Sequence, residues 1–292
     1  MNSLYLEEFF LYLTNEKRYS THTISAYQND LYSFFHYVKK ENIQEINYIV
    51  IQSYFSSLYV ENISMKTISR KLSSIKSYGK FLSKTKSINC DFLKNVILPK
   101  KEKKLPEFLH DEELTKLLNL PCNNFLQLRN SLIINLLYST GLRLSELTNL
   151  KCSDYNQSEN IFKVKGKGNK ERIVIFSNKS KQLLDDYLKE RLMYDGEFLL
   201  INKNHKKLTN RGVENILTNI SKQYLGHEKL HPHMLRHTFA TKLLNKGMDL
   251  RALQELLGHE SLNATQIYTH LAKNQLSEIY RTYHPRGEND DL

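Results

Sequence analysis

The chain has 292 residues, of which 40% are hydrophobic and 25% charged, and its 42 Lys and Arg outnumber its 31 Asp and Glu to give a net charge of +11. At roughly 100–200 residues per domain, this length predicts two folded domains rather than one small core. The positive surplus favours a polyanionic partner, with nucleic acid ahead of an acidic membrane surface.

The cysteines and the amino-terminal residues indicate the cellular compartment of the protein. Cys90, Cys122 and Cys152 are scattered and form no CxxC pair, so neither a disulfide framework nor a thiolate zinc site is supported. The first residues carry acids where a signal peptide needs lysines, and no apolar run approaches the roughly 18 residues of a membrane span. We therefore expect a cytoplasmic protein in a reducing compartment.

The first hundred residues show helical periodicity, with apolar residues three and four apart. Thr21 and Ser64 stand where helix N-caps are expected. We predict a compact helical domain over residues 1–97. Its helices are expected at residues 4–13, 23–38, 48–59 and 67–82.

Positive charge then concentrates in the segment LPKKEKKLPEFL. Pro99 and Pro106 bracket four lysines and discourage a continuous helix. We therefore place an interdomain linker at residues 98–108, followed by a second domain over residues 109–292.

The second domain begins with apolar residues at helical spacing, and one later segment departs from that spacing. Helices are expected at residues 111–120 and 125–140, with Gly141 as a C-terminal cap, and a short helix is expected to begin in GLRLSELTNL. The segment IFKVKGKGNKERIVIF, at 161–176, predicts a β-hairpin because glycines separate two runs rich in Ile, Val and Phe. Further helices are expected at residues 178–192, 209–224, 233–246, 249–257, 261–271 and 275–283.

The segment HPHMLRHTFATKLL, residues 231–244, places three histidines around Arg236. His233 and His237 are four apart on one helix face, as zinc-binding pairs often are. The glutamate of HExxH is missing, however, and the arginine between the histidines would repel a metal cation. We predict no metal site. An alternative is purely structural, with His233 capping the helix and His237 packed inside.

Other candidate residues each have a structural and a functional interpretation. Arg143 opens a helix, where it could hold an anion or pair with Glu146 one turn later. Lys167 lies between two glycines of the hairpin turn, where it could reach a phosphate or remain solvated. His259 follows a glycine, and Tyr268 comes nine residues later. A single tyrosine among 18 is more often a core residue than a nucleophile.

The joint pattern is more specific than its parts. In chain order the sequence presents GLRLSEL, GKGNKER, HPHMLRH, LGHE and IYTH, and this set resembles the motifs of tyrosine recombinases, closely the bacterial Xer branch. The resemblance covers most of the chain, including the helical amino-terminal part, the linker and the HPRG near the end. It implies a mainly α fold with a small β-hairpin or sheet, and a C-shaped DNA clamp formed by a core-binding and a catalytic domain.

The resemblance also implies the reaction and its residues. Tyr268 would attack the phosphodiester to form a 3′-phosphotyrosyl bond, with Lys167 as general acid for the departing 5′-oxygen, and recombination would pass through a Holliday junction without ATP or any cofactor. Two arginines suit the phosphate because they stay charged and offer paired donors. The implied catalytic set is Arg143, Lys167, His233, Arg236, His259 and Tyr268.

Dimer resolution for chromosomes or plasmids is the expected role. The alternatives are a mobile-element integrase with the same chemistry, a type IB topoisomerase, and a non-catalytic DNA-binding protein for which the basic helical domain would suffice.

Two further segments bear on DNA and partners. The pattern MKTISRKLSSIKSYGK favours duplex contacts through Lys66, Arg70, Lys76 and Lys80, although it also fits a solvated charged face. The tail, residues 274–292, carries apolar residues at helical spacing and must dock on its own domain or on a neighbour. The resemblance implies a homo- or hetero-tetramer on two DNA sites, and it admits a paralogous recombinase and a DNA translocase as partners.

Overall fold

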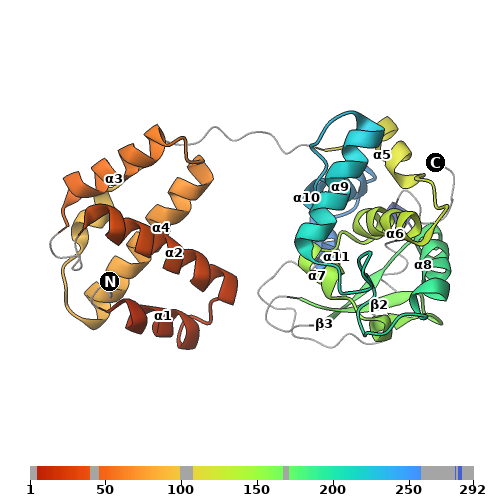
Figure 1. Cartoon of the computed structure of the whole chain (residues 1–292), viewed down its shortest axis with the longest axis horizontal. Coiled ribbons are helices and arrows are strands. Elements are labelled where there is room, and N and C mark those ends of the chain that lie inside the picture. Colours follow the sequence, from red (N-terminus) through yellow and green to blue (C-terminus); the bar gives the residue numbers. More distant parts are fainter. Residues whose placement is uncertain are drawn as a thin grey trace. The chain divides into compact units, whose positions relative to one another are not determined.

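The computed structural model describes residues 5–39, 46–98, 108–166, 171–257, 280 and 282–284. The chain divides into two compact units, Met1–Lys104 and Leu105–Leu292 (Figure 1). The division falls within the lysine-rich segment expected to be a linker, of which residues 99–107 lie outside the described part of the chain.

Within its described residues, the amino-terminal unit contains helices and connecting loops but no strand. Its elements are α1 (Leu6–Asn15), α2 (Thr21–Val38), α3 (Tyr48–Val60), α4 (Met65–Thr85) and the short 3-10 helix η2 (Asp91–Asn95). The predicted helices are confirmed.

One of the two predicted caps in this unit is confirmed. The Ser64 hydroxyl accepts a hydrogen bond from the Thr67 amide at 3.2 Å and so caps α4. The cap predicted at Thr21 was wrong, because Ser20 has the extended backbone of an N-cap and accepts from the Thr23 amide, which leaves Thr21 inside the helix.

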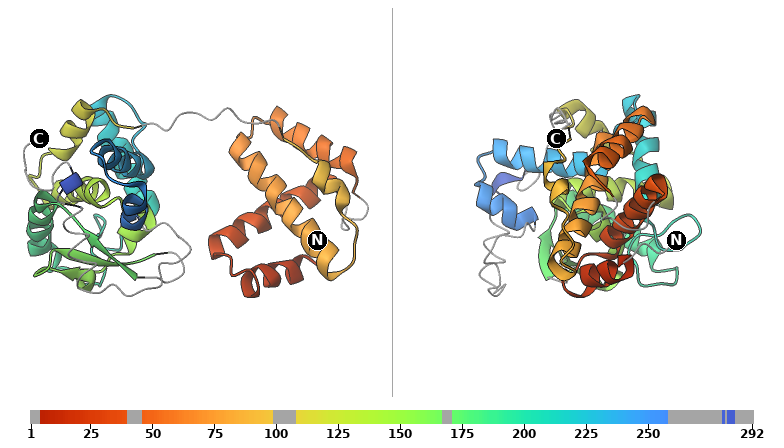
Figure 2. Two further views of the ribbon diagram at one scale, coloured as in Figure 1. Left: turned by 180° about the vertical axis from the view of Figure 1, so that it is seen from behind. Right: turned by 90° about the vertical axis from the view of Figure 1, so that its left-hand side faces the viewer.

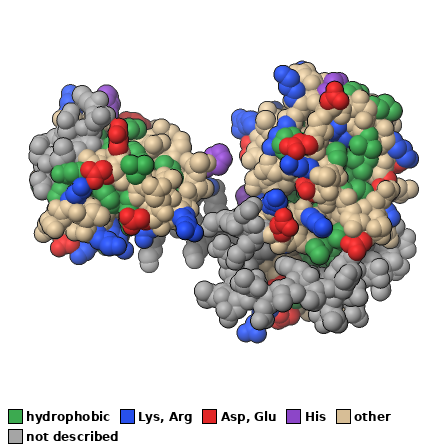
Figure 3. Space-filling model, turned by 90° about the horizontal axis from the view of Figure 1, so that it is seen from below, with side chains coloured by type: hydrophobic (Ala, Val, Ile, Leu, Met, Phe, Trp, Pro, Cys, Tyr) green, Lys and Arg blue, Asp and Glu red, His purple; other side chains and the backbone are tan. Residues whose placement is uncertain are grey.

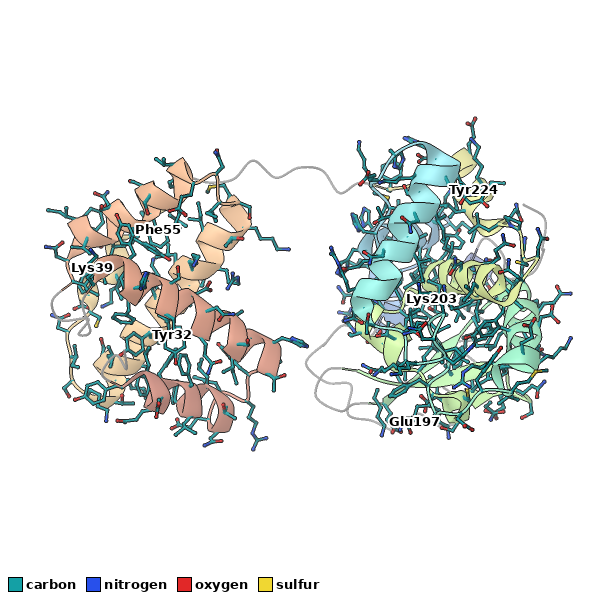
Figure 4. All side chains as sticks on the ribbon, viewed as in Figure 1. Tyr32, Lys39, Phe55, Glu197, Lys203 and Tyr224 are labelled. Atoms are coloured by element: carbon teal, nitrogen blue, oxygen red, sulfur yellow. The ribbon has the colours of Figure 1, made fainter. Side chains whose placement is uncertain are left out.

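Aromatic side chains fill the core of this unit. Phe9 and Tyr78 lie edge to face with ring centroids 5.3 Å apart, and Phe34 meets Tyr54 in the same way at 5.1 Å. Phe55, labelled in Figure 4, belongs to the same buried cluster. Gly79 lets η2 approach α4, because a Cβ atom there would lie 2.3 Å from Leu93 Cδ1.

The second unit combines helices with a small sheet. Its helices are α5 (Asp111–Leu118), α6 (Phe125–Thr140), α7 (Leu144–Asn149), η3 (Cys152–Asp154), α8 (Asn178–Arg191), α9 (Asn210–Leu225), α10 (Pro232–Asn245) and α11 (Leu250–Leu257). Its strands are β1 (Tyr155–Asn156), β2 (Ile161–Lys165) and β3 (Glu171–Ile175). They form an antiparallel sheet in the order β1-β2-β3, at one edge of the unit (Figures 1 and 2).

The predicted hairpin is confirmed, with Val164 on β2 opposite Arg172 on β3. The sequence did not predict β1, because two residues are too few to show alternation. The helix expected at 261–271 lies outside the described residues. Of the last expected helix the structure describes Tyr280, Thr282 and Tyr283, which are helical.

Helix α6 lies at the centre of the unit and leads into the candidate site. Its residues from Ser131 to Thr140 are all buried, and it packs against α8 and α10. It ends at Gly141, which has φ of +59°, as the predicted C-terminal cap requires. Within the described ranges, no helix has the length and apolar character needed to cross a membrane.

Candidate active site

Arg143 immediately precedes α7, as predicted. It is the N-cap residue of the helix, and its amide donates to Glu146 Oε2 at 2.8 Å while Nη1 donates to Oε1 at 2.9 Å. The expected pairing with Glu146 is therefore confirmed. The Arg143 side chain is still 35% exposed, whereas that of Glu146 is only 4% exposed. Pairing and anion binding by Arg143 are thus compatible.

A second arginine, which the sequence did not single out, binds the same carboxylate. Arg172 on β3 donates from Nη1 to Glu146 Oε1 at 2.7 Å and from Nη2 to Oε2 at 3.0 Å. Its side chain is only 7% exposed. The only sequence signal was that strand alternation places Arg172 on the same face as Val174, and a charged residue in a strand is usually taken to face solvent.

The charge of Glu146 is fixed by these contacts. Burial alone would raise the pKa of this carboxyl, but hydrogen bonds and charge from Arg172, together with the amide and guanidinium of Arg143, hold the pKa below its ordinary value. Glu146 is therefore an anion at neutral pH, between two guanidinium groups.

Arg236 on α10 lies close to this cluster. Its Nη1 donates to the Gly141 carbonyl, and its Nη2 donates to the Leu257 carbonyl at 2.9 Å. Burial, followed by the positive charge of Arg143, lowers the pKa of Arg236 to about 10, so the group stays charged at neutral pH. Gly141 is two residues before Arg143, so two separate motifs meet at one place. Figures 1 and 2 show α11 beside α7.

The histidines of the α10 motif have different positions. His231 caps the helix, because its Nδ1 accepts from the Met234 amide at 3.1 Å, and Pro232 occupies the first helical position. The interpretation of His233 as the cap was therefore wrong. His233 is exposed, three residues before Arg236 and so on the same side of the helix. His237 is partly buried.

The remaining catalytic candidates, Lys167, His259 and Tyr268, lie outside the described residues. The structure describes β2 and β3, before and after the segment that contains Lys167, and it describes Leu257, two residues before His259. Within the described ranges, His, Cys, Asp and Glu side chains form no group of three or more suited to a metal ion.

The candidate DNA-binding residues on α4 fall into two pairs. Lys66 and Lys80 are exposed. Arg70 forms an ion pair with the buried Asp30 and donates to the Ala26 carbonyl at 3.1 Å, and Lys76 donates to the Val96 carbonyl at 2.9 Å. Arg70 and Lys76 thus contribute to the fold of this unit. In Figure 3, Lys and Arg side chains are interspersed with Asp and Glu on both units.

Comparison with known proteins places the chain in a family. Residues 107–275 match the model of the Phage integrase family, and residues 6–86 match that of its N-terminal SAM-like domain. The chain is 40% identical to "Tyrosine recombinase XerC" of Bacillus pumilus, over 96% of this chain and 95% of that protein. The chain belongs to the phage integrase family. It is therefore a tyrosine site-specific recombinase, and its partner is DNA.

Other relatives agree with this assignment. The recombinase is 38% identical to "Tyrosine recombinase XerC" of Listeria monocytogenes, over 96% of this chain and 97% of that protein. A solved structure of XerH bound to a palindromic difH substrate in a post-cleavage complex has a TM-score of 0.70 and 28% identity, covering 94% of this chain and 82% of the other. The Tn1549 transposon integrase, at 18% identity, shares the fold with a TM-score of 0.71, covering 92% of this chain and 98% of the other.

Proposed function

We propose that this recombinase cuts DNA through attack of Tyr268 on a phosphodiester, forms a 3′-phosphotyrosyl intermediate and exchanges strands through a Holliday junction. The observation that carries the proposal is the meeting of Arg236 with Gly141, two residues before Arg143. Two guanidinium groups are thereby held at one place, and guanidinium groups match the charge and the geometry of phosphate oxygens.

The two arginines have complementary parts in this chemistry. Arg236 is rigidly held by two carbonyl oxygens, and Arg143 is partly exposed. Both would stabilise negative charge as it develops on the nonbridging oxygens of the phosphate. His233, exposed on the same side of α10 as Arg236, would add a hydrogen bond or transfer a proton.

The other three residues complete the proposed reaction. A free tyrosine has a pKa of about 10, so the cationic pocket would ease ionisation of Tyr268 as it attacks. Lys167 would protonate the departing 5′-oxygen, and His259 would assist at the phosphate. The phosphotyrosyl bond keeps the energy of the phosphodiester, so a second strand can displace the tyrosine without ATP.

The division of labour between the two units is part of the proposal. Residues 1–97 would form the core-binding domain, residues 98–108 the linker, and residues 109–292 the catalytic domain of a C-shaped clamp. Lys66 and Lys80 are the α4 candidates for phosphate contacts, because both are exposed. Arg70 and Lys76 would contact DNA phosphates only with donors that their intramolecular hydrogen bonds do not use.

The role that we propose is resolution of chromosome or plasmid dimers rather than integration of a mobile element, and the XerC relatives support it. We propose the cytoplasm as the place where it acts. We further propose that four protomers assemble on two sites, with residues 274–292 passing between neighbours. The tetramer would contain this chain alone or together with a paralogous recombinase, and a DNA translocase would act on it.

Covalent capture of DNA tests the proposal. Genomic DNA nicked at random is incubated with the protein, because a nick beside the cleaved phosphate releases a short 5′-hydroxyl fragment and traps the adduct. Sequencing of the captured DNA should give one site and one nucleotide. Tyr268→Phe should give no adduct while DNA affinity is retained, and Tyr224→Phe serves as the control. An adduct that persists with Tyr268→Phe would exclude this residue as the nucleophile.

A further inference from the structure

We propose that Arg172 is a positioning residue for the reaction, acting on Arg143 through Glu146. This inference rests on the proposed phosphate-binding role of Arg143. Arg172 balances the charge of the buried Glu146 carboxylate. Without Arg172, this carboxylate would bind the Arg143 guanidinium more fully and keep it from the DNA phosphate.

The contacts of Glu146 show how the carboxylate is shared. A carboxylate has about four lone-pair positions for hydrogen bonds. Here Oε1 accepts from Arg143 Nη1 and Arg172 Nη1, and Oε2 accepts from the Arg143 amide and Arg172 Nη2. Arg172 thus holds both oxygens, whereas the side chain of Arg143 holds one. Glu146 thus orients the Arg143 side chain through one hydrogen bond, from Nη1 to Oε1.

Removal of Arg172 would change this sharing. Glu146 is buried, so loss of its main partner would leave a desolvated anion. The nearest cation that could replace Arg172 is the guanidinium of Arg143, which would turn to bind the carboxylate through two parallel hydrogen bonds. Arg143 would then be withdrawn from the phosphate. The site would also lose one of its three positive charges, those of Arg143, Arg172 and Arg236.

A second route must be distinguished from the first. Arg172 lies on β3, and the segment of the chain between β2 and β3 contains Lys167. Its bonds to Glu146 therefore also fasten the hairpin to α7. Loss of Arg172 could act on the leaving group through Lys167 rather than on the nonbridging oxygens through Arg143. The two routes predict opposite rate changes when the nonbridging oxygens of the phosphate are altered and when the leaving group is altered.

Three versions of the captured DNA site separate these routes in single-turnover cleavage. One has an ordinary phosphodiester, one has a neutral methylphosphonate, and one has a 5′-sulfur leaving group that needs no proton. Arg172→Met should slow the ordinary and the sulfur substrates by about 100-fold, the scale of a misplaced catalytic group. It should slow the methylphosphonate only a few-fold, because that transition state carries one negative charge fewer on the nonbridging groups. Lys167→Ala should show the reverse pattern, with rescue by sulfur.

Two comparisons tie the effect to Glu146. Arg129→Met removes another buried arginine of the same unit, one that contacts the Ile201 carbonyl and Asn130, and should leave the ratio of the substrate rates unchanged. The double variant Arg172→Met with Glu146→Gln should be no slower than Glu146→Gln alone, because residues acting through one contact are not additive.

The outcomes are decisive in either direction. Equal slowing of all substrates by Arg172→Met, or rescue by the sulfur substrate, would overturn the inference. If Arg172→Met does not fold, Arg172→Lys keeps the charge without the planar fork and should show the same substrate dependence to a smaller degree. Equal loss on every substrate with Arg172→Lys would then overturn it. A wild-type protein that forms no adduct would reject the proposed function instead.

Discussion

The ring of His284 stacks on the ring of Tyr280, with centroids 4.4 Å apart and planes 9° from parallel. Both residues are almost fully buried, and His284 also contacts the rings of Tyr138 and Phe239, each at 5.7 Å. This part of the tail therefore packs on its own unit. Docking on a neighbouring subunit, as we propose for the tetramer, would require these contacts to be exchanged.

The first prediction concerns this tail. Removal of residues 274–292 should preserve binding to one DNA site but destroy the two-site complex, and it should lower the free energy of unfolding by about 3 kcal/mol, because buried aromatic contacts are lost. Native gels with one-site and two-site DNA, together with urea unfolding, measure both effects. Removal of residues 288–292 alone is the control. A truncated protein that assembles and recombines normally would show that the tail is only intramolecular core.

The second prediction concerns Arg236→Lys. An ammonium group lacks the planar fork that reaches both the Gly141 and the Leu257 carbonyls. Cleavage should fall by about 100-fold or more, and unfolding should require about 1–3 kcal/mol less, since a buried acceptor loses its partner. Arg143→Lys, at a partly exposed position, should lower cleavage with a smaller change in unfolding. Comparable losses of stability in the two variants would contradict this assignment.

The third prediction compares two glycines with positive φ. At Gly141, φ is +59° and a Cβ atom would lie 2.7 Å from Leu257 Cδ2 and 2.8 Å from Phe239 Cδ1. At Gly226, φ is +74°, and an added Cβ atom would have no atom of another part of the chain within 4 Å. Gly226→Ala should cost about 1 kcal/mol from backbone strain alone. Gly141→Ala adds crowding, for a total of about 2–4 kcal/mol. Equal costs in urea unfolding would refute the packing argument.

The fourth prediction concerns acid stability. The pKa of Glu146 is lower in the folded protein than its ordinary value of 4.5, which it approaches in the unfolded chain. Its contribution to stability is therefore full above about pH 4.5 and is lost as the pH falls through the lowered folded pKa. The difference in unfolding free energy between pH 6 and pH 3 should be smaller for Glu146→Gln than for wild type. The exposed Glu255→Gln is the control, and an unchanged difference in Glu146→Gln would argue against the buried pairing.

The fifth prediction concerns metals. Because Arg143 and Arg236 supply the positive charge proposed for the phosphate, EDTA should leave formation of the covalent adduct unchanged. The adduct yield is compared with and without chelator, and after addition of zinc or magnesium. Cleavage that disappears with EDTA and returns with either metal would revive the metal interpretation of the α10 histidines.

Local signals predicted the elements well. Periodicity located the described helices, Gly141 was predicted as a cap because a helix end needs a left-handed residue, and the glycine turn identified the hairpin. The errors were smaller and equally local. Ser20 and His231 are the caps, each one or two residues from the predicted residue, because serine, threonine and histidine side chains can all accept a bond from the helix amides.

Local sequence patterns could not predict which residues far apart in the chain would contact each other. The motifs named Arg143 and Arg236, but nothing in either motif indicates that Arg236 reaches the Gly141 carbonyl. Arg172 was missed for the same reason, since its partner lies 26 residues earlier and only the folded chain buries both. The assignments of Lys167, His259 and Tyr268, and the contacts of α4 with DNA, remain predictions.

The position of Arg236 also affects how the site prepares for DNA. One of its carbonyl partners, Gly141, is the C-cap of α6, and the other belongs to Leu257 on α11. The carboxyl end of a helix carries about half a negative charge, so the dipole of α6 stabilises the buried cation. The guanidinium is thus oriented during folding, and little reorganisation remains when a phosphate arrives. The entropic cost of ordering this side chain falls on folding instead of recurring in each round of strand exchange.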